Sequence, residues 1–253
     1  RGRIPQRRTQ GIIHHGAGTC QPPVPAPTFS TPIMKITAFA AAIVLAGATM
    51  TMSAQDKYGE LYYQRASLFE ALGVDSTNIV FLGNSLTHGC EWHELLGMPN
   101  VVNRGINGDI IEGIRERIAP VVDGHPAKIF LMVGANDVSH DLTADSIVTA
   151  ACQLIDYIRE TTPSTKLYVQ SMLPINNSFG RYKKMIGKEQ VIRDINTKLE
   201  PEVERRGATW VNLHPAFCDA DGNLRADFTN DVLHLLAPGY LTWREIILPY
   251  VKE

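Results

Sequence analysis

The sequence predicts one α/β domain: a three-layer α/β/α fold around a parallel, flavodoxin-like sheet of about five strands. Short apolar runs rich in β-branched residues alternate along the chain with amphipathic stretches of helical length. Most of these runs end at glycine, asparagine or proline, as expected where a strand passes into a loop. The part of the chain that carries this pattern, residues 55–253, is long enough to bury a sizeable core.

The sequence before this domain divides into two parts. Residues 1–33 are rich in arginine and proline, contain no acidic residue and show no hydrophobic periodicity, so we interpret them as unstructured, translated upstream sequence. Residues 34–54 begin with Met34 and Lys35, continue as an apolar run and end in small residues, which is typical of a cleaved secretory signal peptide. An uncleaved anchor is the alternative. We therefore expect a secreted or periplasmic protein without stable membrane insertion after signal cleavage.

Charge and cysteine usage exclude several classes of protein. The whole chain has a formal net charge of −2, and residues 1–54 hold five basic and no acidic residues, so residues 55–253 carry −7. An acidic domain is not expected to bind nucleic acid. Its cysteines, Cys90, Cys152 and Cys218, are odd in number and form no C-x-x-C pair, which indicates neither a disulfide framework nor a zinc site. Cys152 lies on the apolar side of a predicted helix, where we expect it to pack.

The expected elements follow from hydrophobic periodicity. The predicted strands are residues 79–82, 101–102, 129–133, 167–172 and 209–213. The predicted helices are residues 57–73, a short helix that contains Trp92 and ends at Gly97, and residues 110–122, 143–161, 191–206 and 239–251. The first helix has the apolar residues Leu61, Tyr62, Ala66, Leu68, Phe69 and Leu72, and Asp109 is the predicted cap of the helix 110–122. Residues 173–189 form a long polar and aromatic loop, which we interpret either as a wall of the substrate site or as a solvated loop.

Chemically useful side chains follow three of the predicted strands. Ser85, Gly108 and Asn136 come after the first, second and third strands, so they are expected at one edge of the sheet, where open α/β sheets bind ligands. Asp231 and His234 are three residues apart and can face the same way in a turn. A histidine can remove the proton of a serine hydroxyl, and a carboxylate can orient that histidine. Backbone N–H groups of Ser85 and Gly108, with the Asn136 amide, would stabilise an oxyanion.

These residues carry a resemblance to the SGNH hydrolases, also called GDSL-type esterases and lipases, which are named for Ser, Gly, Asn and His in four separate blocks. Gly83-Asn84-Ser85-Leu86 resembles the first block, and residues 103–109 resemble the second, with Gly108 as its glycine. Gly134-Ala135-Asn136-Asp137 is similar to the third block and Asp231-Val232-Leu233-His234 to the fourth. The chain looks most like small acetylhydrolases related to platelet-activating-factor acetylhydrolase and like carbohydrate O-acetyl esterases. Asn84 departs from the family pattern, which usually has Asp there.

The resemblance implies a serine esterase that works through an acyl-enzyme intermediate and needs no cofactor and no metal. Its expected catalytic residues are Ser85, Asp231 and His234, and its expected oxyanion hole is Ser85, Gly108 and Asn136. The expected substrate is a small-molecule or carbohydrate ester, with a short, acetyl-like acyl group. A lysophospholipase or thioesterase of the same family is the alternative.

Other interpretations of the same residues are weaker. Gly105 and Gly108 follow a strand but do not form the Gly-x-Gly-x-x-Gly fingerprint of a dinucleotide site. His88, Cys90 and His93 have a spacing that matches no familiar metal site. A non-catalytic, flavodoxin-like binding module remains the alternative from another class of protein, and the intact set of serine, aspartate and histidine argues against it.

Overall fold

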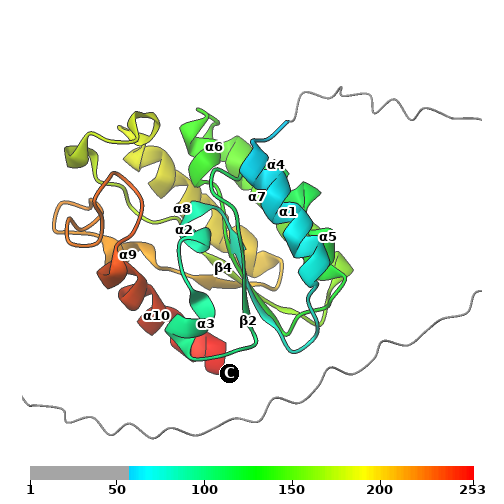
Figure 1. Cartoon of the computed structure of the whole chain (residues 1–253). Helices are drawn as coiled ribbons and strands as arrows, with labels where there is room; N and C mark the ends of the chain where they lie inside the picture. Colours follow the sequence, from blue (N-terminus) through cyan, green and yellow to red (C-terminus); the bar gives the residue numbers. More distant parts are fainter. Residues whose placement is uncertain (1–56) are drawn as a thin grey trace, which may run out of the picture. The chain divides into compact units, whose positions relative to one another are not determined.

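The structure, a computed structural model, describes residues 57–253 and contains one five-stranded sheet. Its strands are β1 (Ile79–Gly83), β2 (Val101–Gly105), β3 (Lys128–Met132), β4 (Lys166–Gln170) and β5 (Thr209–Val211). All neighbouring strands are parallel, in the order β2-β1-β3-β4-β5 (Figure 1). This is the flavodoxin-like order, in which β2 is added on one side of β1 and β3 on the other, so that the strand order switches between β1 and β3. The predicted fold class is confirmed, and all five predicted strands are present.

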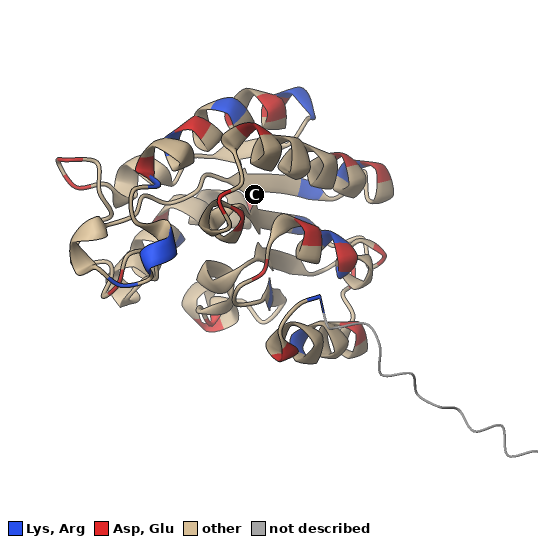
Figure 2. Ribbon diagram, turned by 90° about the horizontal axis from the view of Figure 1, so that it is seen from above, with Lys and Arg blue, Asp and Glu red and all other residues tan. Residues whose placement is uncertain are grey.

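Helices cover both faces of the sheet (Figures 1 and 2). The helices of the described residues are α1 (Glu60–Leu72), α2 (Ser85–His88), α3 (Trp92–Leu96), α4 (Ile111–Glu116), α5 (Ala119–Val122), α6 (Ala135–Ser139), α7 (Ala144–Thr161), α8 (Glu189–Arg205), α9 (His214–Phe217) and α10 (Ala237–Lys252), with the short 3-10 turns η1 (Asn177–Phe179) and η2 (Lys183–Met185). Charged residues lie mainly along the helices and loops and are few on the strands (Figure 2). A parallel sheet buried on both faces needs such apolar strands.

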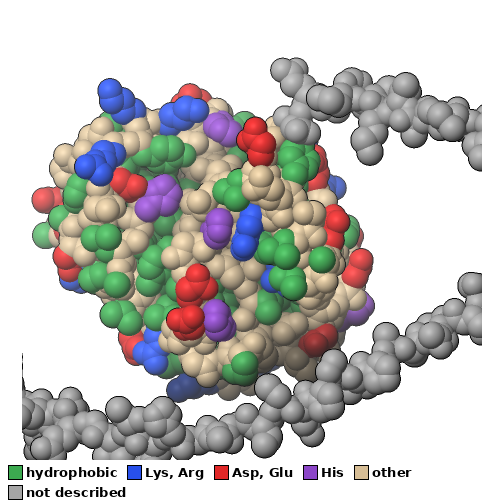
Figure 3. Space-filling view, viewed as in Figure 1, with side chains coloured by type: hydrophobic (Ala, Val, Ile, Leu, Met, Phe, Trp, Pro, Cys, Tyr) green, Lys and Arg blue, Asp and Glu red, His purple; other side chains and the backbone are tan. Residues whose placement is uncertain are grey.

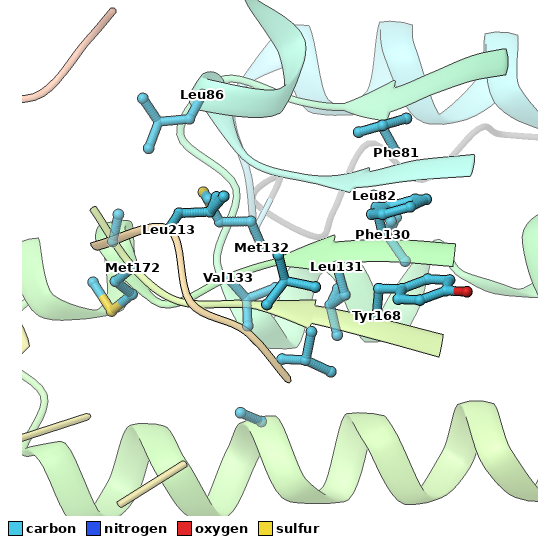
Figure 4. Close-up of a cluster of buried hydrophobic side chains, with 14 of the residues drawn as sticks. Phe81, Leu82, Leu86, Phe130, Leu131, Met132, Val133, Tyr168, Met172 and Leu213 are labelled. Carbon is cyan, nitrogen blue, oxygen red and sulfur yellow. The ribbon is translucent and has the colours of Figure 1, made fainter. Parts of the chain in front are cut away.

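The core is organised around a row of aromatic side chains that crosses the sheet. Phe81, Phe130 and Tyr168 occupy matching register positions on β1, β3 and β4, and their rings stack with centroid separations of 4.9 and 4.6 Å (Figure 4). Trp92 of α3 stacks on Phe81 at 4.0 Å, and Trp243 of α10 meets Trp92 edge-on at 5.0 Å. These contacts attach α3 and α10 to one face of the sheet, because large aromatic surfaces stabilise strongly when buried.

The predicted helix 110–122 is wrong in two respects. It is two short helices, α4 and α5, because Pro120 lacks the N–H that a continuous helix needs and instead lies in the first turn of α5. Asp109 does not cap it. The carboxylate of Asp137 accepts from the Ile111 N–H at 3.3 Å, whereas Asp109 pairs with Arg117 at 2.7 Å in a fully buried ion pair.

The first helix forms as predicted and ends at Gly73, but its apolar residues are not all inward. Tyr62 and Phe69 are buried, whereas Leu61, Leu68 and Leu72 are 39, 43 and 62% exposed. Figure 3 shows hydrophobic side chains on the surface in the region of α1. Helix α1 therefore packs through two aromatic side chains rather than through a leucine stripe.

Further predictions concern single residues and the N-terminal segments. Cys152 is buried on α7, as predicted. The proposed upstream sequence, residues 1–33, and the signal peptide, residues 34–54, lie outside the described residues. Within residues 57–253, no helix is both long and apolar enough to span a membrane.

Candidate active site

Two glycines allow the chain to turn sharply at the end of β1, where Ser85 is presented. A Cβ atom on Gly83 would lie 2.4 Å from the Thr87 Oγ1 and 2.5 Å from the Met132 carbonyl oxygen. A Cβ atom on Gly105, the register partner of Gly83, would lie 2.3 Å from the His88 backbone nitrogen. Only glycine permits this close approach, so helix α2 rests directly against the ends of two strands.

Helix α2 begins at Ser85 and is held by side chains from the residues around it and from α10. Its N-cap is Asn84, whose side-chain oxygen accepts from the Leu86 N–H at 3.1 Å. Tyr240 donates its hydroxyl to the Leu86 carbonyl at 3.0 Å, and Trp92 donates its indole N–H to the Thr87 carbonyl at 2.9 Å. A four-residue helix cannot satisfy these carbonyls itself, so the side chains determine where α2, and with it the serine, lies.

The structure brings Ser85, His234 and Asp231 together. His234 Nε2 lies 3.0 Å from Ser85 Oγ, and His234 Nδ1 lies 2.8 Å from Asp231 Oδ2. The other carboxylate oxygen of Asp231 accepts from the backbone N–H groups of Leu233 and His234, both at 2.7 Å. One carboxylate therefore shapes the turn and also orients the imidazole, which explains why a spacing of three residues suffices.

The Asp231 carboxylate has a lowered pKa. Burial raises it, but the Leu233 N–H, the His234 ring and the His234 N–H together outweigh burial by stabilising the charged form. The ionised carboxylate accepts a hydrogen bond from His234 Nδ1–H. His234 Nε2 is then free to accept the Ser85 hydroxyl proton, which is the arrangement that activates a serine nucleophile.

The expected oxyanion donors also meet at this edge of the sheet. Asn136 is buried in α6 and donates one Nδ2 hydrogen to the Asp109 carbonyl at 2.8 Å, which places it beside Gly108. Its second Nδ2 hydrogen remains available. Gly108 has φ +79°, and a Cβ there would face open space. Among residues 57–253, the backbone N–H groups of Ser85 and Gly108 have no acceptor.

A cavity of about 410 Å³ adjoins Gly108. Its lining mixes aromatic and polar side chains from the start of α1, the loop after β2 and the end of α6, among them Tyr58, Asn107 and His140. Most of its lining surface is apolar, and a few polar groups reach into it. Such a lining suits a ligand that presents apolar surface together with a few hydrogen-bonding groups.

Sequence reasoning missed Tyr182. The loop that contains it was predicted to be either a substrate wall or solvated, and no local pattern distinguished this tyrosine from its neighbours. Its hydroxyl donates to Asn136 Oδ1 at 3.2 Å, and its ring lies 6.0 Å from the His234 ring. The loop therefore supplies at least one side chain to the site.

Of the other histidines, His140 lines the cavity beside Gly108. His214 contacts the Met172 carbonyl through Nδ1 at 3.0 Å. Within the described part of the chain, no three His, Cys, Asp or Glu side chains are grouped to hold a metal ion.

The fold and the geometry of Ser85, His234 and Asp231 are those of a serine hydrolase built on a parallel α/β sheet. The chain belongs to the GDSL-like lipase/acylhydrolase family, which matches residues 81–241. It is accordingly a carboxylic ester hydrolase of the acylhydrolase type, and the resemblance to SGNH hydrolases is confirmed.

Individual relatives are more distant. The platelet-activating factor acetylhydrolase IB subunit alpha1 of Rattus norvegicus is 26% identical over 173 residues, which cover 64% of this chain and 69% of the relative. A putative platelet activating factor structure from Streptococcus pneumonia superposes with a TM-score of 0.70 at 24% identity, covering 76% of this chain and 92% of the other. Axe2, an acetyl-xylooligosaccharide esterase from Geobacillus, gives 0.57 at 16% identity, covering 71% and 96%. At these identities the two structures establish a shared fold.

Proposed function

We propose that this chain hydrolyses short-chain esters, chiefly acetyl esters on carbohydrates, with Ser85, His234 and Asp231 as its catalytic triad. The observation that carries this proposal is the continuous chain of contacts from Ser85 Oγ through His234 to Asp231, at 3.0 and 2.8 Å. The proposed chemistry needs no cofactor and no metal, because the serine, its base and the oxyanion donors are all side chains or backbone groups of the protein.

The proposed reaction has two acyl-transfer steps. Ser85 Oγ bonds to the ester carbonyl carbon while its proton moves to His234 Nε2, and Asp231 stabilises the imidazolium. The carbonyl oxygen becomes negative and is stabilised by the Ser85 and Gly108 N–H groups and the Asn136 amide. The carbon–oxygen bond to the alcohol then breaks, and His234 returns the proton to the leaving oxygen. Water, deprotonated by His234, attacks the acyl-enzyme and releases the acid and Ser85.

Two observations support a small acyl group and a sugar alcohol. The cavity beside Gly108 is lined by tyrosine rings together with amide and imidazole groups, which suit the apolar face and the hydroxyls of a sugar. Two proteins of similar sequence or fold have names that include acetylhydrolase and acetyl-xylooligosaccharide esterase. The alternative, a lysophospholipase or thioesterase, needs a long apolar groove. Membership of an acylhydrolase family argues against the other alternative, a non-catalytic binding module.

A hydrolysis panel on the full chain tests the substrate class. We expect p-nitrophenyl acetate to be cleaved faster than the butyrate and octanoate esters, and acetylated xylose or glucosamine to release acetate. Ser85→Ala is the control for non-enzymatic hydrolysis. Preference for octanoate, or release of fatty acid from a lysophospholipid with no acetate release from sugars, would replace this proposal with the lysophospholipase or thioesterase alternative.

A fluorophosphonate probe tests the triad itself. Wild type should be labelled at Ser85, because the activated hydroxyl attacks phosphorus as it would a carbonyl carbon. Labelling should disappear in Ser85→Ala and nearly disappear in His234→Ala. Peptide mapping that places the label on another serine would refute the assignment of the nucleophile.

We also propose that the protein is secreted or periplasmic and that export removes residues up to about Gln55. Support comes from the sequence of residues 34–54, with its basic start, apolar run and small-residue end. N-terminal sequencing of protein recovered from an expressing cell tests this. A recovered chain that still begins at Met34 or earlier would contradict it.

A further inference from the structure

Tyr182 occupies an unusual backbone position in the loop between β4 and α8. Its φ is +46° and its ψ is +59°, in the left-handed region that residues with side chains rarely adopt. Such conformations persist where surrounding contacts over-determine them, and they concentrate at functional sites. The contacts around Tyr182 therefore hold this backbone conformation in place.

The loop is anchored on both sides of Tyr182. Before it, the Asn176 N–H donates to the Val232 carbonyl at 2.8 Å, and the Asn176 side chain donates to the Leu224 carbonyl at 2.7 Å. After it, Met185 is completely buried in the core. These contacts hold the loop against the segment that leads to His234, so the tyrosine side chain has a defined place in the site.

The Tyr182 hydroxyl and the Asp109 carbonyl contact opposite ends of the Asn136 amide. The hydroxyl lies 3.2 Å from Asn136 Oδ1, and the Asp109 carbonyl oxygen lies 2.8 Å from Nδ2. If the amide were rotated by 180°, Oδ1 would face the Asp109 carbonyl, and two acceptors would oppose each other without a hydrogen. The two partners therefore permit one orientation, in which the remaining Nδ2 hydrogen is available on the side away from Asp109.

We propose that Tyr182 is a positioning residue that holds the Asn136 amide ready to donate to the oxyanion of the ester reaction. The proposal rests on the triad and oxyanion hole proposed above, and extends them. The Tyr182 hydroxyl acts in two ways. It fixes the direction of the amide before substrate binds, and by donating to Oδ1 it polarises the amide and strengthens the remaining N–H as a donor.

Tyr182→Phe in the full chain tests the hydroxyl alone, because the ring beside His234 is retained. We expect kcat for p-nitrophenyl acetate to fall about three- to tenfold, as befits one lost hydrogen bond. KM should change less than about twofold, since the ground-state carbonyl gains little from the amide. Tyr157→Phe is the matched control, because Tyr157 lies on α7 and packs, partly buried, against the hydrophobic core. It should leave kcat unchanged.

A double variant decides whether Tyr182 acts through Asn136. In an Asn136→Ala background, Tyr182→Phe should cause no further loss of kcat, because residues that act as a unit are not additive. The same loss in both backgrounds would overturn the proposal, as would a folded Tyr182→Phe protein with wild-type kcat. Melting temperatures of all variants establish that each protein is folded.

The outcomes also separate this proposal from the proposed function. Wild type that is neither labelled by fluorophosphonate nor active on any ester would refute the triad and, with it, the role of Tyr182. Wild type that is labelled and cleaves p-nitrophenyl acetate, with Tyr182→Phe equally active, would refute the role of Tyr182 alone.

Discussion

His234 Nε2 lies 3.0 Å from Ser85 Oγ, although the two residues are 149 positions apart in the chain. Ser85 begins α2, and His234 lies in the turn before α10. Helix α10 joins the two segments directly, because its Tyr240 hydroxyl donates to the Leu86 carbonyl at 3.0 Å. Trp243 of α10 packs against Trp92 of α3, the helix that follows α2. The distance between Ser85 Oγ and His234 Nε2 therefore depends on how α10 docks on the sheet.

Asn136 is expected to act on the transition state. Hydrogen bonds to an oxyanion strengthen as its charge develops, so Asn136→Ala should lower kcat by a factor on the order of 10²–10³ with little change in KM. Asn136→Asp is a useful companion, since it keeps the size and the acceptor for Tyr182 but removes both N–H donors. Steady-state kinetics and thermal melting of one preparation measure both effects. A folded Asn136→Ala protein with kcat within about threefold of wild type would remove Asn136 from the mechanism.

Asp231 is expected to contribute to activity less than the serine or histidine, and to stability in a pH-dependent way. Asp231→Asn should be milder than Ser85→Ala or His234→Ala in kcat, because the carboxylate orients the base without reacting. Its pKa is lower in the folded protein than its ordinary value of 3.8. The unfolded chain therefore binds the proton more tightly, and the stabilisation is present above the ordinary pKa and is lost as pH falls through the folded pKa.

The measurement is urea denaturation of wild type and Asp231→Asn from about pH 7 down to about pH 2.5, a range that spans the unperturbed pKa of Asp. The difference in free energy of unfolding should be constant near neutral pH and shrink below about pH 4. Asp109, whose pKa burial raises to about 6 despite its Arg117 partner, titrates in both proteins and cancels from the difference. A difference that does not vary with pH would contradict the assigned direction of the Asp231 shift.

Gly105 is expected to be required for the position of α2. Gly105→Ala should lower the free energy of unfolding by about 1–3 kcal/mol or more, because its Cβ would lie 2.3 Å from a backbone nitrogen that cannot move independently of α2. Gly59→Ala is the matched control, since nothing lies within 4 Å of a Cβ there and its φ is −71°. Its cost should stay below about 1 kcal/mol. Equal melting temperatures for the two variants would count against this explanation of the glycine.

Lys128 is expected to stabilise the C-terminal end of α10. Its ammonium group, almost completely buried, donates to the Tyr250 and Val251 carbonyls at 2.7 and 2.8 Å. These carbonyls lack partners within the helix, so Lys128→Met should cost about 1–3 kcal/mol. Lys166, its register partner on β4, is exposed and forms a weak surface ion pair with Glu253, at 3.5 Å. Lys166→Met should therefore change stability by less than about 0.5 kcal/mol. Chemical denaturation compares the two, and similar losses would rule out a special role for Lys128.

Local patterns in the sequence were sufficient for the fold and for the part of the sheet where the site lies. Short apolar runs that contain β-branched residues and end at a glycine, such as Ile79–Leu82, indicate buried strands, and Ser85, Gly108 and Asn136 each follow a predicted strand. In a parallel sheet all carboxyl ends lie at one edge, so strand order and chain direction already bring such residues to one side. The spacing of Asp231 and His234 was also informative, because the turn that joins these two residues is local.

The partners of individual polar groups depended on the tertiary structure. Asp109 was expected to cap a helix but pairs with Arg117, and Asp137 takes the capping role. Tyr182 contacts Asn136 from a loop that the sequence indicated as a possible wall of the substrate site, but no sequence pattern identified this tyrosine or its partner. A carboxylate, amide or hydroxyl binds whichever donor or acceptor the packed chain places within about 3 Å. Contacts between distant segments determine which partner each polar group finds. Hydrophobic periodicity cannot predict these partners, because it indicates only which face of an element is buried.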